Sequence, residues 1–271
     1  IGEDIFIEIS HGPTLVDNNI FLSERSIKFA SQGGAFVHNL FAGSLTCIGT
    51  GTDNGAPDIK SQRYTSYHAI HGTRVIGFMS FLHGDVRFCN NIFVQRPVLP
   101  FFHEVQTAVE NAEDPNARMW DTMNFNVGTF VYDEYPTEDE WKKQFEGYCG
   151  MGSHNPYPNR YYSHLPVWAK GNVYLGGAKP WKKEQNAVVD DSFVPELSLE
   201  ETADGLKLKT NLAAYAAGIS DGVISTGDLG MRFENPDGSE IIFNQDYFGD
   251  HREAAAMPGP FATEDAWSRM V

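Results

Sequence analysis

The chain has 271 residues, of which 41 % are apolar and 13 % aromatic, which is enough for one large hydrophobic core or two modest ones. Its formal charge of −16 argues against nucleic acid as a partner, because phosphate binding needs a basic face, and it leaves neutral ligands such as sugars open. No apolar run approaches the roughly 18 residues that would span a bilayer, and no basic start precedes an apolar core, so we expect neither a membrane segment nor a signal peptide.

The three cysteines, Cys47, Cys89 and Cys149, are odd in number and widely spaced. They form no Cys-x-x-Cys pair, so we expect free thiols rather than a disulfide framework or a zinc site. Free thiols are typical of a reducing compartment, and we therefore expect a cytoplasmic protein. The sequence indicates no cofactor and no metal.

The first segment, residues 3–13, reads as a β-strand that ends at Gly12-Pro13. Its isoleucines alternate with other residues, which places them on one face and Glu8 on the other. A carboxylate on a rigid element, with His11 close by, suits a general acid/base. The alternative is that Glu8 is a solvated side chain on an outer face.

A short motif, asparagine followed by an apolar and then an aromatic residue, recurs along the chain. The copies begin at Asn19, Asn39, Asn91 and, more weakly, Asn172. The first two are 20 residues apart, a period typical of a solenoid, and asparagines stacked at a turn can hydrogen-bond along a ladder with a spacing of about 4.8 Å. We therefore predict an all-β fold, a right-handed parallel β-helix with long loop excursions. Chance recurrence of the triplet is the alternative.

The same spacing predicts a neighbour for Glu8. Lys28 precedes Asn39 by as many residues as Glu8 precedes Asn19, so stacked coils would place Lys28 beside Glu8. An ammonium at that distance would favour the ionised carboxylate. A structural ion pair and a functional one are equally open. Because the strand pattern is already under way at Ile1, we expect the chain to be the carboxy-terminal part of a longer polypeptide.

Two excursions interrupt the repeat. The first contains the turn-rich residues 49–58, which lack the carboxylate spacing of a calcium loop, and then His68 and His71 among tyrosines. A metal pair is possible there, but without an evident third ligand we favour hydrogen bonds to sugar hydroxyls. The second covers residues 97–170. It contains Trp120, a packing residue or a sugar platform, and a capping box at Thr137 that predicts one short helix.

We expect coils over residues 1–178 and an antiparallel β extension over residues 179–271 that packs on them. The extension has short alternating segments, among them residues 205–212. A hairpin turn is predicted at Asn235-Pro236-Asp237-Gly238.

Several of these segments together resemble glycoside hydrolase family 120, the parallel β-helix β-xylosidases. The resemblance spans most of the chain and is densest in residues 3–94. It rests on the residues 8–13, 16–23, 31–35 and 38–43, on Tyr67-His68-x-x-His71, on Arg87-Phe88-x-Asn90-Asn91-Ile92-Phe93-Val94, and on Asp246-Tyr247-Phe248-Gly249. Val86 departs from it, since a second acidic residue is expected there.

The resemblance implies a retaining β-glycosidase in which Glu8 is the acid/base. It also implies an Asp nucleophile on the preceding coil, upstream of Ile1, and an inserted β-sandwich upstream. We therefore expect a β-xylosidase fragment that acts on xylo-oligosaccharides, with His11, Lys28, His68 and His71 as substrate-binding residues. We expect it to be inactive without its nucleophile, and a homo-oligomer is open as its assembled form. A polysaccharide lyase with Lys28 as base, or a non-catalytic carbohydrate-binding β-helix, are the alternatives.

Overall fold

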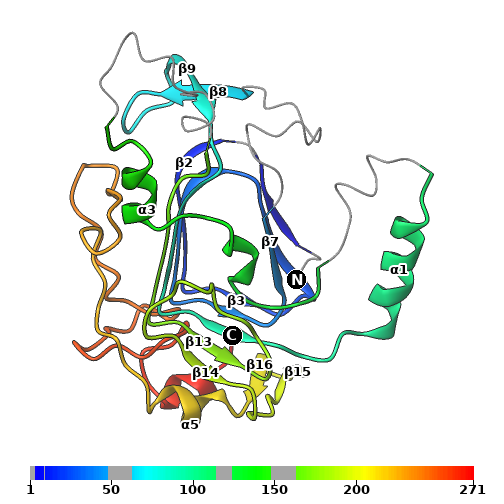
Figure 1. Ribbon diagram of the computed structural model, residues 1–271. Coiled ribbons are helices and arrows are strands. Elements are labelled where there is room, and N and C mark those ends of the chain that lie inside the picture. The colour runs from blue at the N-terminus through cyan, green and yellow to red at the C-terminus, as the bar shows by residue number, and fades with distance from the viewer. Residues whose placement is uncertain (1–3, 9, 48–62, 114–123, 148–162) are drawn as a thin grey trace.

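The computed structural model describes the whole chain except residues 1–3, 9, 48–62, 114–123 and 148–162. Three parallel sheets form its body (Figure 1). Sheet A has the strand order β1-β4-β7, sheet B has β2-β5-β10-β12, and sheet C has β3-β6-β11-β13-β14. The strands are β1 (Ile5–Ile7), β2 (His11–Asp17), β3 (Ile20–Phe21), β4 (Arg25–Phe29), β5 (Gln32–Val37), β6 (Leu40–Phe41), β7 (Ser44–Cys47), β10 (Gly84–Cys89), β11 (Ile92–Val94), β12 (Val167–Lys170), β13 (Val173–Leu175) and β14 (Val188–Asp190).

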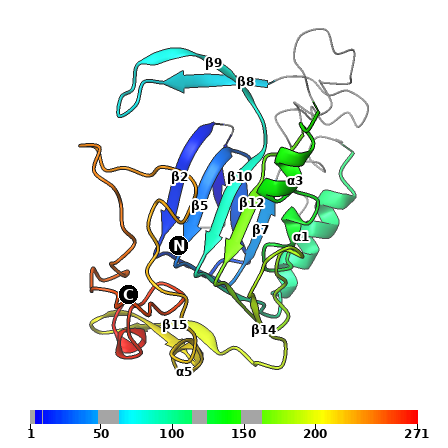
Figure 2. The same cartoon turned by 60° about the vertical axis from the view of Figure 1, so that its left-hand side comes forward.

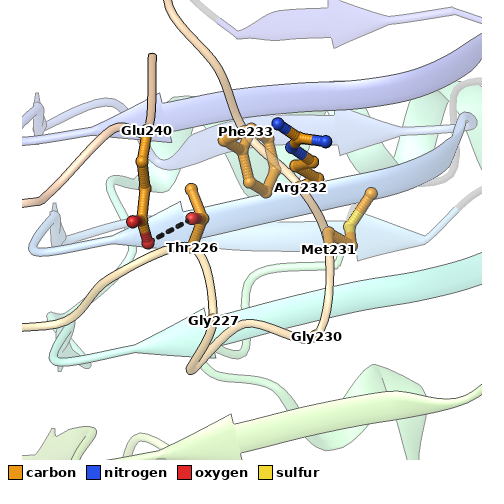
Figure 3. A pocket seen from close by; sticks show the side chains of 7 residues that line it. All are labelled: Thr226, Gly227, Gly230, Met231, Arg232, Phe233 and Glu240. Atoms are coloured by element: carbon orange, nitrogen blue, oxygen red, sulfur yellow. Dashed lines mark hydrogen bonds between the residues drawn. The ribbon is translucent and has the colours of Figure 1, made fainter. Parts of the chain in front are cut away.

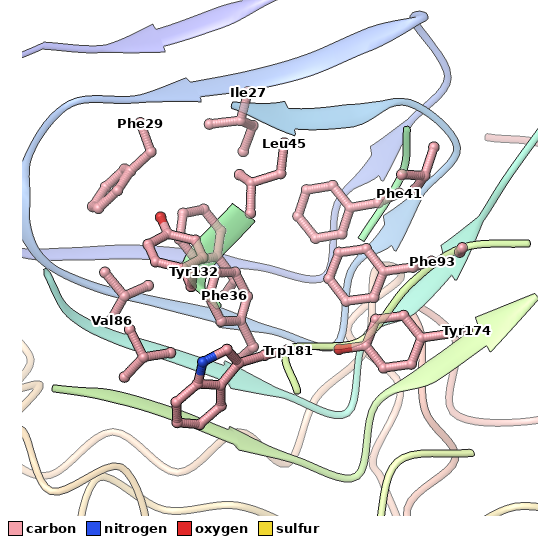
Figure 4. Packing of buried hydrophobic residues seen from close by; sticks show 14 of the residues in the cluster. Ile27, Phe29, Phe36, Phe41, Leu45, Val86, Phe93, Tyr132, Tyr174 and Trp181 are labelled. Atoms are coloured by element: carbon pink, nitrogen blue, oxygen red, sulfur yellow. The ribbon is translucent and has the colours of Figure 1, made fainter. Parts of the chain in front are cut away.

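The chain passes from sheet B to sheet C to sheet A and returns to sheet B one rung further on. Thus β2, β3 and β4 are followed by β5, β6 and β7, and each strand pairs in parallel with its counterpart in the next rung. The mostly β composition and the parallel pairing agree with the sequence prediction. Buried side chains from all three sheets fill the inside of the winding (Figure 4).

The asparagines of the recurring triplet form a hydrogen-bonded ladder at the turn between sheets B and C. The backbone N–H and the side-chain Nδ2 of Asn19 both donate to Asn39 Oδ1, at 2.9 and 3.2 Å. Asn39 donates in the same way to Asn91 Oδ1, at 2.9 and 3.0 Å, and Asn91 to Asn172 Oδ1, at 3.0 and 2.9 Å. Asn172 Nδ2 ends the ladder on Glu184 Oε1 at 2.8 Å. The predicted ladder is confirmed.

The aromatic residue of each triplet stacks on that of the next rung. The ring centroids of Phe21, Phe41, Phe93 and Tyr174 follow one another at 4.9, 4.9 and 5.0 Å, with interplanar angles of 11° or less. This spacing equals the distance between neighbouring strands, so one hydrogen-bond ladder and one aromatic stack fix the same register. A slip of one residue would break both, because it would turn the aromatic side chains outward.

The first interruption is an antiparallel hairpin of β8 (Arg63–His68) and β9 (Val75–Phe81), which projects from the stacked strands between β7 and β10 (Figure 2). The second contains helix α1 (Pro100–Glu110), the 3-10 turn η1 (Phe130–Tyr132) and helix α3 (Glu138–Lys143). The capping box of α3 is present: Thr137 accepts from the Glu140 backbone, and Glu140 accepts from the Thr137 backbone.

Residues 97–170 were expected to hold one helix, but the described part holds two α-helices. Helix α1 begins with Pro100 at its first turn and buries none of its residues. The sequence did not indicate this helix because it has no clear apolar face that packs on the core. Even its large apolar residue Phe101 is exposed. Helix α3 ends at Lys143. Trp120 and residues 49–58 lie outside the described residues.

The parallel winding continues past residue 178, since β14 pairs in parallel with β13.

After β14, the strands β15 (Leu197–Thr202) and β16 (Gly205–Thr210) form an antiparallel hairpin, and helix α5 (Leu212–Ala216) follows. The turn at residues 235–238 is closed by a hydrogen bond from the Gly238 N–H to the Asn235 carbonyl at 2.8 Å. The remaining helical element is η2 (Asp265–Ser268). Helix α5 was not expected, because the sequence pattern there reads as a continuing strand. In the described residues no helix is both long and apolar enough to cross a membrane.

The extension packs on the outer faces of two sheets. Leu208, Phe261 and Trp267 share a buried cluster with Leu40 and Ile92 of sheet C. A second cluster joins Ile224 and Phe233 to Ala35 and Val37 of sheet B. The extension therefore covers the outward side chains of sheets B and C.

Replacement of Asn91 by alanine should destabilise the fold by about 3 kcal/mol, because it leaves the buried Asn39 N–H, the Asn39 amide and the Phe36 carbonyl without their partner. Urea denaturation at neutral pH measures this. The exposed Asn126, changed in the same way, is the matched control and should stay within roughly 0.5 kcal/mol of the wild type. Equal effects of the two changes would show that the ladder adds no stability.

Candidate functional site

Glu8 lies just after β1, where the chain turns from sheet A into β2 of sheet B. Ile7 before it packs against the main core, and the strand alternation directs the neighbouring Glu8 away from that core. Glu8 is exposed. Among the described strands β1 is the terminal strand of sheet A, so the carboxylate lies at the edge of that sheet.

The predicted pairing of Lys28 with Glu8 is wrong in register. Phe6, not Glu8, lies opposite Lys28, because Ile5 pairs with Ile27 and the offset in sheet A is 22 residues. In sheet B the offset between paired residues falls to 20 only after a register shift between His11 and Thr14. The 20-residue spacing of the asparagines therefore does not apply to the pairing of β1 with β4. The Lys28 Nζ lies 3.6 Å from Asp4 Oδ2.

Asp4 is a charged group that the sequence reasoning did not single out. Its Oδ2 lies 2.6 Å from Arg25 Nε as well as near Lys28, and the three side chains are each less than one-fifth exposed. The carboxylate is on the same outward side of β1 as Phe6, since the two are separated by one residue of strand. The arrangement is an ion-pair cluster on the outer face of sheet A.

His11 begins β2 and connects this corner with the projecting hairpin. Its Nε2 lies 3.2 Å from the Met79 carbonyl oxygen of β9. Next to it the Ser10 and Ser31 hydroxyls are 2.7 Å apart, and Gln32 Oε1 accepts from the Leu82 N–H at 2.6 Å. The turn between sheets A and B is thus lined with polar groups, and the base of the hairpin is fixed to it.

His68 and His71 occupy the other end of the hairpin. His68 pairs with Val75, whereas Met79 pairs with Thr65, three residues back along β8. At about 3.4 Å per residue this puts His68 roughly 10 Å further out than the level of His11. His71 Nε2 contacts Glu234 Oε2 of the carboxy-terminal extension at 2.7 Å. The structure therefore links His11 to the base of the hairpin and His71 to the extension.

Both faces of the hairpin expose large apolar side chains. Phe78 is 71 % exposed and Tyr64 58 %, although a two-stranded hairpin needs packing on at least one face to be stable by itself. The others are Tyr67, Ile70, Val75, Ile76 and Met79. The hairpin thus offers aromatic surface close to the corner that holds Glu8.

Val86, where an acidic residue was expected, is fully buried in the core. The charged residues beside it face outward: Arg87 ion-pairs with Asp85, stacks at 3.8 Å over the Trp168 ring and donates to the Leu229 carbonyl. Burial lowers the pKa of Arg87, and the Asp85 carboxylate opposes that shift. This arginine therefore fixes the extension to sheet B.

A pocket of about 450 Å³ lies in the extension near this contact (Figure 3). Thr226 donates to Glu240 across it at 2.8 Å, and Met231 and Phe233 supply its apolar wall. It contains none of the residues singled out from the sequence. We assign it no role in catalysis.

Sequence reasoning also missed a polar group inside the winding, made of the buried His83 and Tyr135 and the partly buried Cys47. The Tyr135 hydroxyl lies 2.7 Å from His83 Nδ1 and 3.0 Å from Cys47 Sγ, and His83 Nε2 lies 3.1 Å from the Phe29 carbonyl. Burial raises the pKa of Cys47 to about 12 and lowers that of His83 to about 4. The thiol and the imidazole are therefore both neutral at pH 7, and the group is not an activated nucleophile.

The thiols of Cys47 and Cys89 are free, and Cys149 lies outside the described residues. Across the described part of the chain, no group of three or more His, Cys, Asp or Glu residues is placed to hold a metal ion. The chemistry this surface offers is that of an exposed carboxylate beside imidazole, hydroxyl and aromatic groups. That set suits acid/base work on a polyhydroxylated ligand.

Comparison with known proteins gives a solved structure described as the complex structure of XylC with xylose. The two structures superpose with a TM-score of 0.71 at 30 % sequence identity, over 95 % of this chain and 35 % of that one. No family model matches the sequence, and no curated protein matches it. The fold of the chain is thus similar to that of XylC, and the chain spans about a third of the length of that protein.

The buried His83 predicts a pH dependence of stability. Its pKa is lower in the folded state, about 4, than the roughly 6.5 of an unfolded chain, so the unfolded state binds a proton first as the pH falls. His83 therefore makes its full contribution to the free energy of unfolding above pH 6.5. This contribution decreases by about 3 kcal/mol as the pH falls to 4.

Urea denaturation between pH 7.5 and 4 tests this with His83→Gln, which keeps polar atoms but cannot be protonated. The stability advantage of the wild type over the variant should shrink as the pH falls. The exposed His103, changed to Gln, is the control and should follow the wild-type curve. A constant difference between wild type and His83→Gln would show that His83 is not buried neutral.

Proposed function

We propose that this chain is the carboxy-terminal portion of a retaining glycoside hydrolase of the family 120 type, a β-xylosidase that acts on xylo-oligosaccharides. Glu8 is its general acid/base, and its nucleophile is an Asp on the rung that precedes β1. The observation that carries the proposal is the similarity over 95 % of the chain to a protein solved with xylose. The fold in this proposal is a right-handed parallel β-helix, with coils up to β14 and an extension after it.

The position of Glu8 supports a two-carboxylate mechanism. Adjacent rungs stand about 4.8 Å apart, so a carboxylate in the same column of a preceding rung would lie near the 5 to 5.5 Å separation of retaining enzymes. Glu8 would protonate the leaving oxygen while the partner attacks the anomeric carbon, and would then deprotonate the water that releases the sugar.

We propose that His11, Lys28, His68 and His71 bind substrate or orient Glu8. His11 is close in sequence to Glu8 and carries the base of the hairpin, so it is best placed to act near the acid/base. Lys28 lies on the outer face of sheet A, where it forms an ion pair with Asp4. His68 and His71 sit further out on the hairpin and would contact more distant sugar units, with His71 steadied by Glu234.

The lyase alternative needs Lys28 as a base, and a base must be uncharged to accept a proton. Lys28 is instead held in an ion pair, with its Nζ 3.6 Å from Asp4 Oδ2, so the geometry supports the hydrolase better. We also propose a cytoplasmic location, in line with the free thiols of Cys47 and Cys89, and a homo-oligomer as the possible assembled form.

Replacement of Glu8 by Gln in the longer polypeptide should lower hydrolysis of aryl xylosides with poor leaving groups by roughly 10²- to 10⁴-fold, the range expected for loss of a general acid. With an activated leaving group the first step needs no acid, so added azide should restore turnover and give a xylosyl azide of retained configuration. A chromogenic assay and product analysis measure both effects. Residues 1–271 alone should not hydrolyse the xyloside, because the proposed nucleophile is not among these residues.

The exposed Glu196, changed to Gln, is the matched control and should leave the rate unchanged. Wild-type rates in the Glu8 variant would remove Glu8 from the mechanism. Absence of hydrolysis in the wild-type polypeptide, with sugar binding retained, would favour a non-catalytic carbohydrate-binding solenoid.

A further inference from the structure

The loop that forms the pocket of Figure 3 packs on the outward face of sheet B. Met231 and Phe233 of the pocket wall belong to one apolar cluster with Ala35 of β5. A methyl group added to Gly33 would lie 3.2 Å from Met231 Cε and 3.4 Å from Asp85 Oδ2. The pocket wall therefore rests on the beginning of β5 and the beginning of β10.

The beginning of sheet B is also where the proposed acid/base lies. In the strand register, His11 of β2, Gln32 of β5 and Gly84 of β10 lie side by side, and the positions under Met231 follow by one residue. Neighbouring strands are about 4.8 Å apart, so the pocket wall is one to two rungs, or roughly 5 to 10 Å, from His11 along the winding. Glu8 precedes His11 by three residues at the same corner.

The order of the strands gives the direction from the scissile bond to the pocket. Strands β5 and β10 lie on one side of β2, and the rung of the proposed nucleophile lies on the other side. The nucleophile attacks the anomeric carbon in line with the departing oxygen, which the acid/base protonates, so the leaving group extends from the nucleophile past the acid/base. Sugar units of the leaving group would therefore extend along sheet B toward the pocket.

The β8–β9 hairpin connects the corner with the pocket. At its base the Met79 carbonyl lies 3.2 Å from His11 Nε2. At its far end His71 Nε2 lies 2.7 Å from Glu234 Oε2, and Glu234 directly follows Phe233 of the pocket wall. The hairpin thus extends from the corner with the acid/base to the rim of the pocket and borders the path between them.

The side chains around the pocket suit a neutral, polyhydroxylated ligand. Thr226 is only 6 % exposed, and its hydroxyl donates to Glu240 Oε1 at 2.8 Å, which fixes an exposed carboxylate in the pocket. Arg232 adds a guanidinium on a side chain that is 81 % exposed. A carboxylate accepts hydrogen bonds from sugar hydroxyls and a guanidinium donates to them, while the apolar wall covers C–H groups. The lining carries one charge of each sign, which favours a ligand without net charge.

We propose that this pocket, of about 450 Å³, is a distal subsite that binds a sugar unit on the leaving-group side of a xylo-oligosaccharide. Glu240 accepts hydrogen bonds from the sugar hydroxyls, Arg232 donates to its oxygen atoms, and Thr226 holds the Glu240 carboxylate in place. The pocket takes no part in bond cleavage and raises the affinity for longer substrates. The inference rests on the proposed function, which gives the direction of the bound chain.

Kinetics of the longer polypeptide with xylotetraose and with an aryl xyloside test the proposal. Glu240→Gln should raise KM for xylotetraose by roughly fivefold to tenfold with kcat unchanged, because hydrogen bonds to a charged group are lost. Gly227→Leu should have a similar or larger effect, because Gly227 lines the pocket and a Cβ there meets only Ser225 Oγ, at an ordinary 3.5 Å. The aryl xyloside ends before the pocket, so its KM should not change in either variant.

The exposed Glu253 of the same extension, changed to Gln, is the matched control and should keep both KM values. A second measurement does not depend on turnover: calorimetric binding of xylotetraose to the Glu8→Gln polypeptide should weaken by the same factor when Gly227→Leu is added. An unchanged KM for xylotetraose in both pocket variants, or an equal rise for the aryl xyloside, would overturn the subsite and leave the hydrolase proposal intact. Absence of hydrolysis of both substrates by the wild type would contradict the proposed function instead. In that case, xylotetraose binding that Gly227→Leu does not weaken would overturn the subsite as well.

Discussion

The rest of this structure depends on the hydrogen bonds that connect Asn19, Asn39, Asn91 and Asn172. A parallel strand pair offers little to fix its register by itself when both faces are apolar, and here successive rungs are separated by insertions as long as that between β7 and β10. An amide that receives two N–H groups from the rung before it and bonds a carbonyl of that rung permits one register only. The aromatic stack then follows, since each ring is two residues from its asparagine.

This fixed winding is what places the groups that carry the proposed chemistry. It lets long segments leave the solenoid and return without a change in register, so the hairpin β8–β9 stands over the turn that holds Glu8 and His11. The group of Cys47, His83 and Tyr135 inside the winding has a different role. They fill the inside of the winding with neutral polar groups that satisfy one another, and their shifted pKa values reflect burial rather than activation.

The sequence was sufficient for the features that are local or that repeat. The triplets predicted the ladder, and Thr137 with Glu140 predicted the start of α3, because both depend on residues a few positions apart or on equal spacing. It was not sufficient where the spacing changes. The placement of Lys28 beside Glu8 assumed equal rungs, and a register shift in β2 invalidates that assumption. Glu184 as the end of the ladder, and Asp4 as the partner of Lys28, depend on tertiary contacts that no local pattern reveals.

The most direct test of the account is a crystal structure of the longer polypeptide with a non-hydrolysable xyloside bound. The account predicts that one Glu8 oxygen lies within hydrogen-bond distance of the glycosidic oxygen, and that a carboxylate from the preceding rung lies about 5 to 5.5 Å from Glu8 on the side of the anomeric carbon. A sugar bound away from the turn between β1 and β2, with Glu8 directed into solvent, would contradict it.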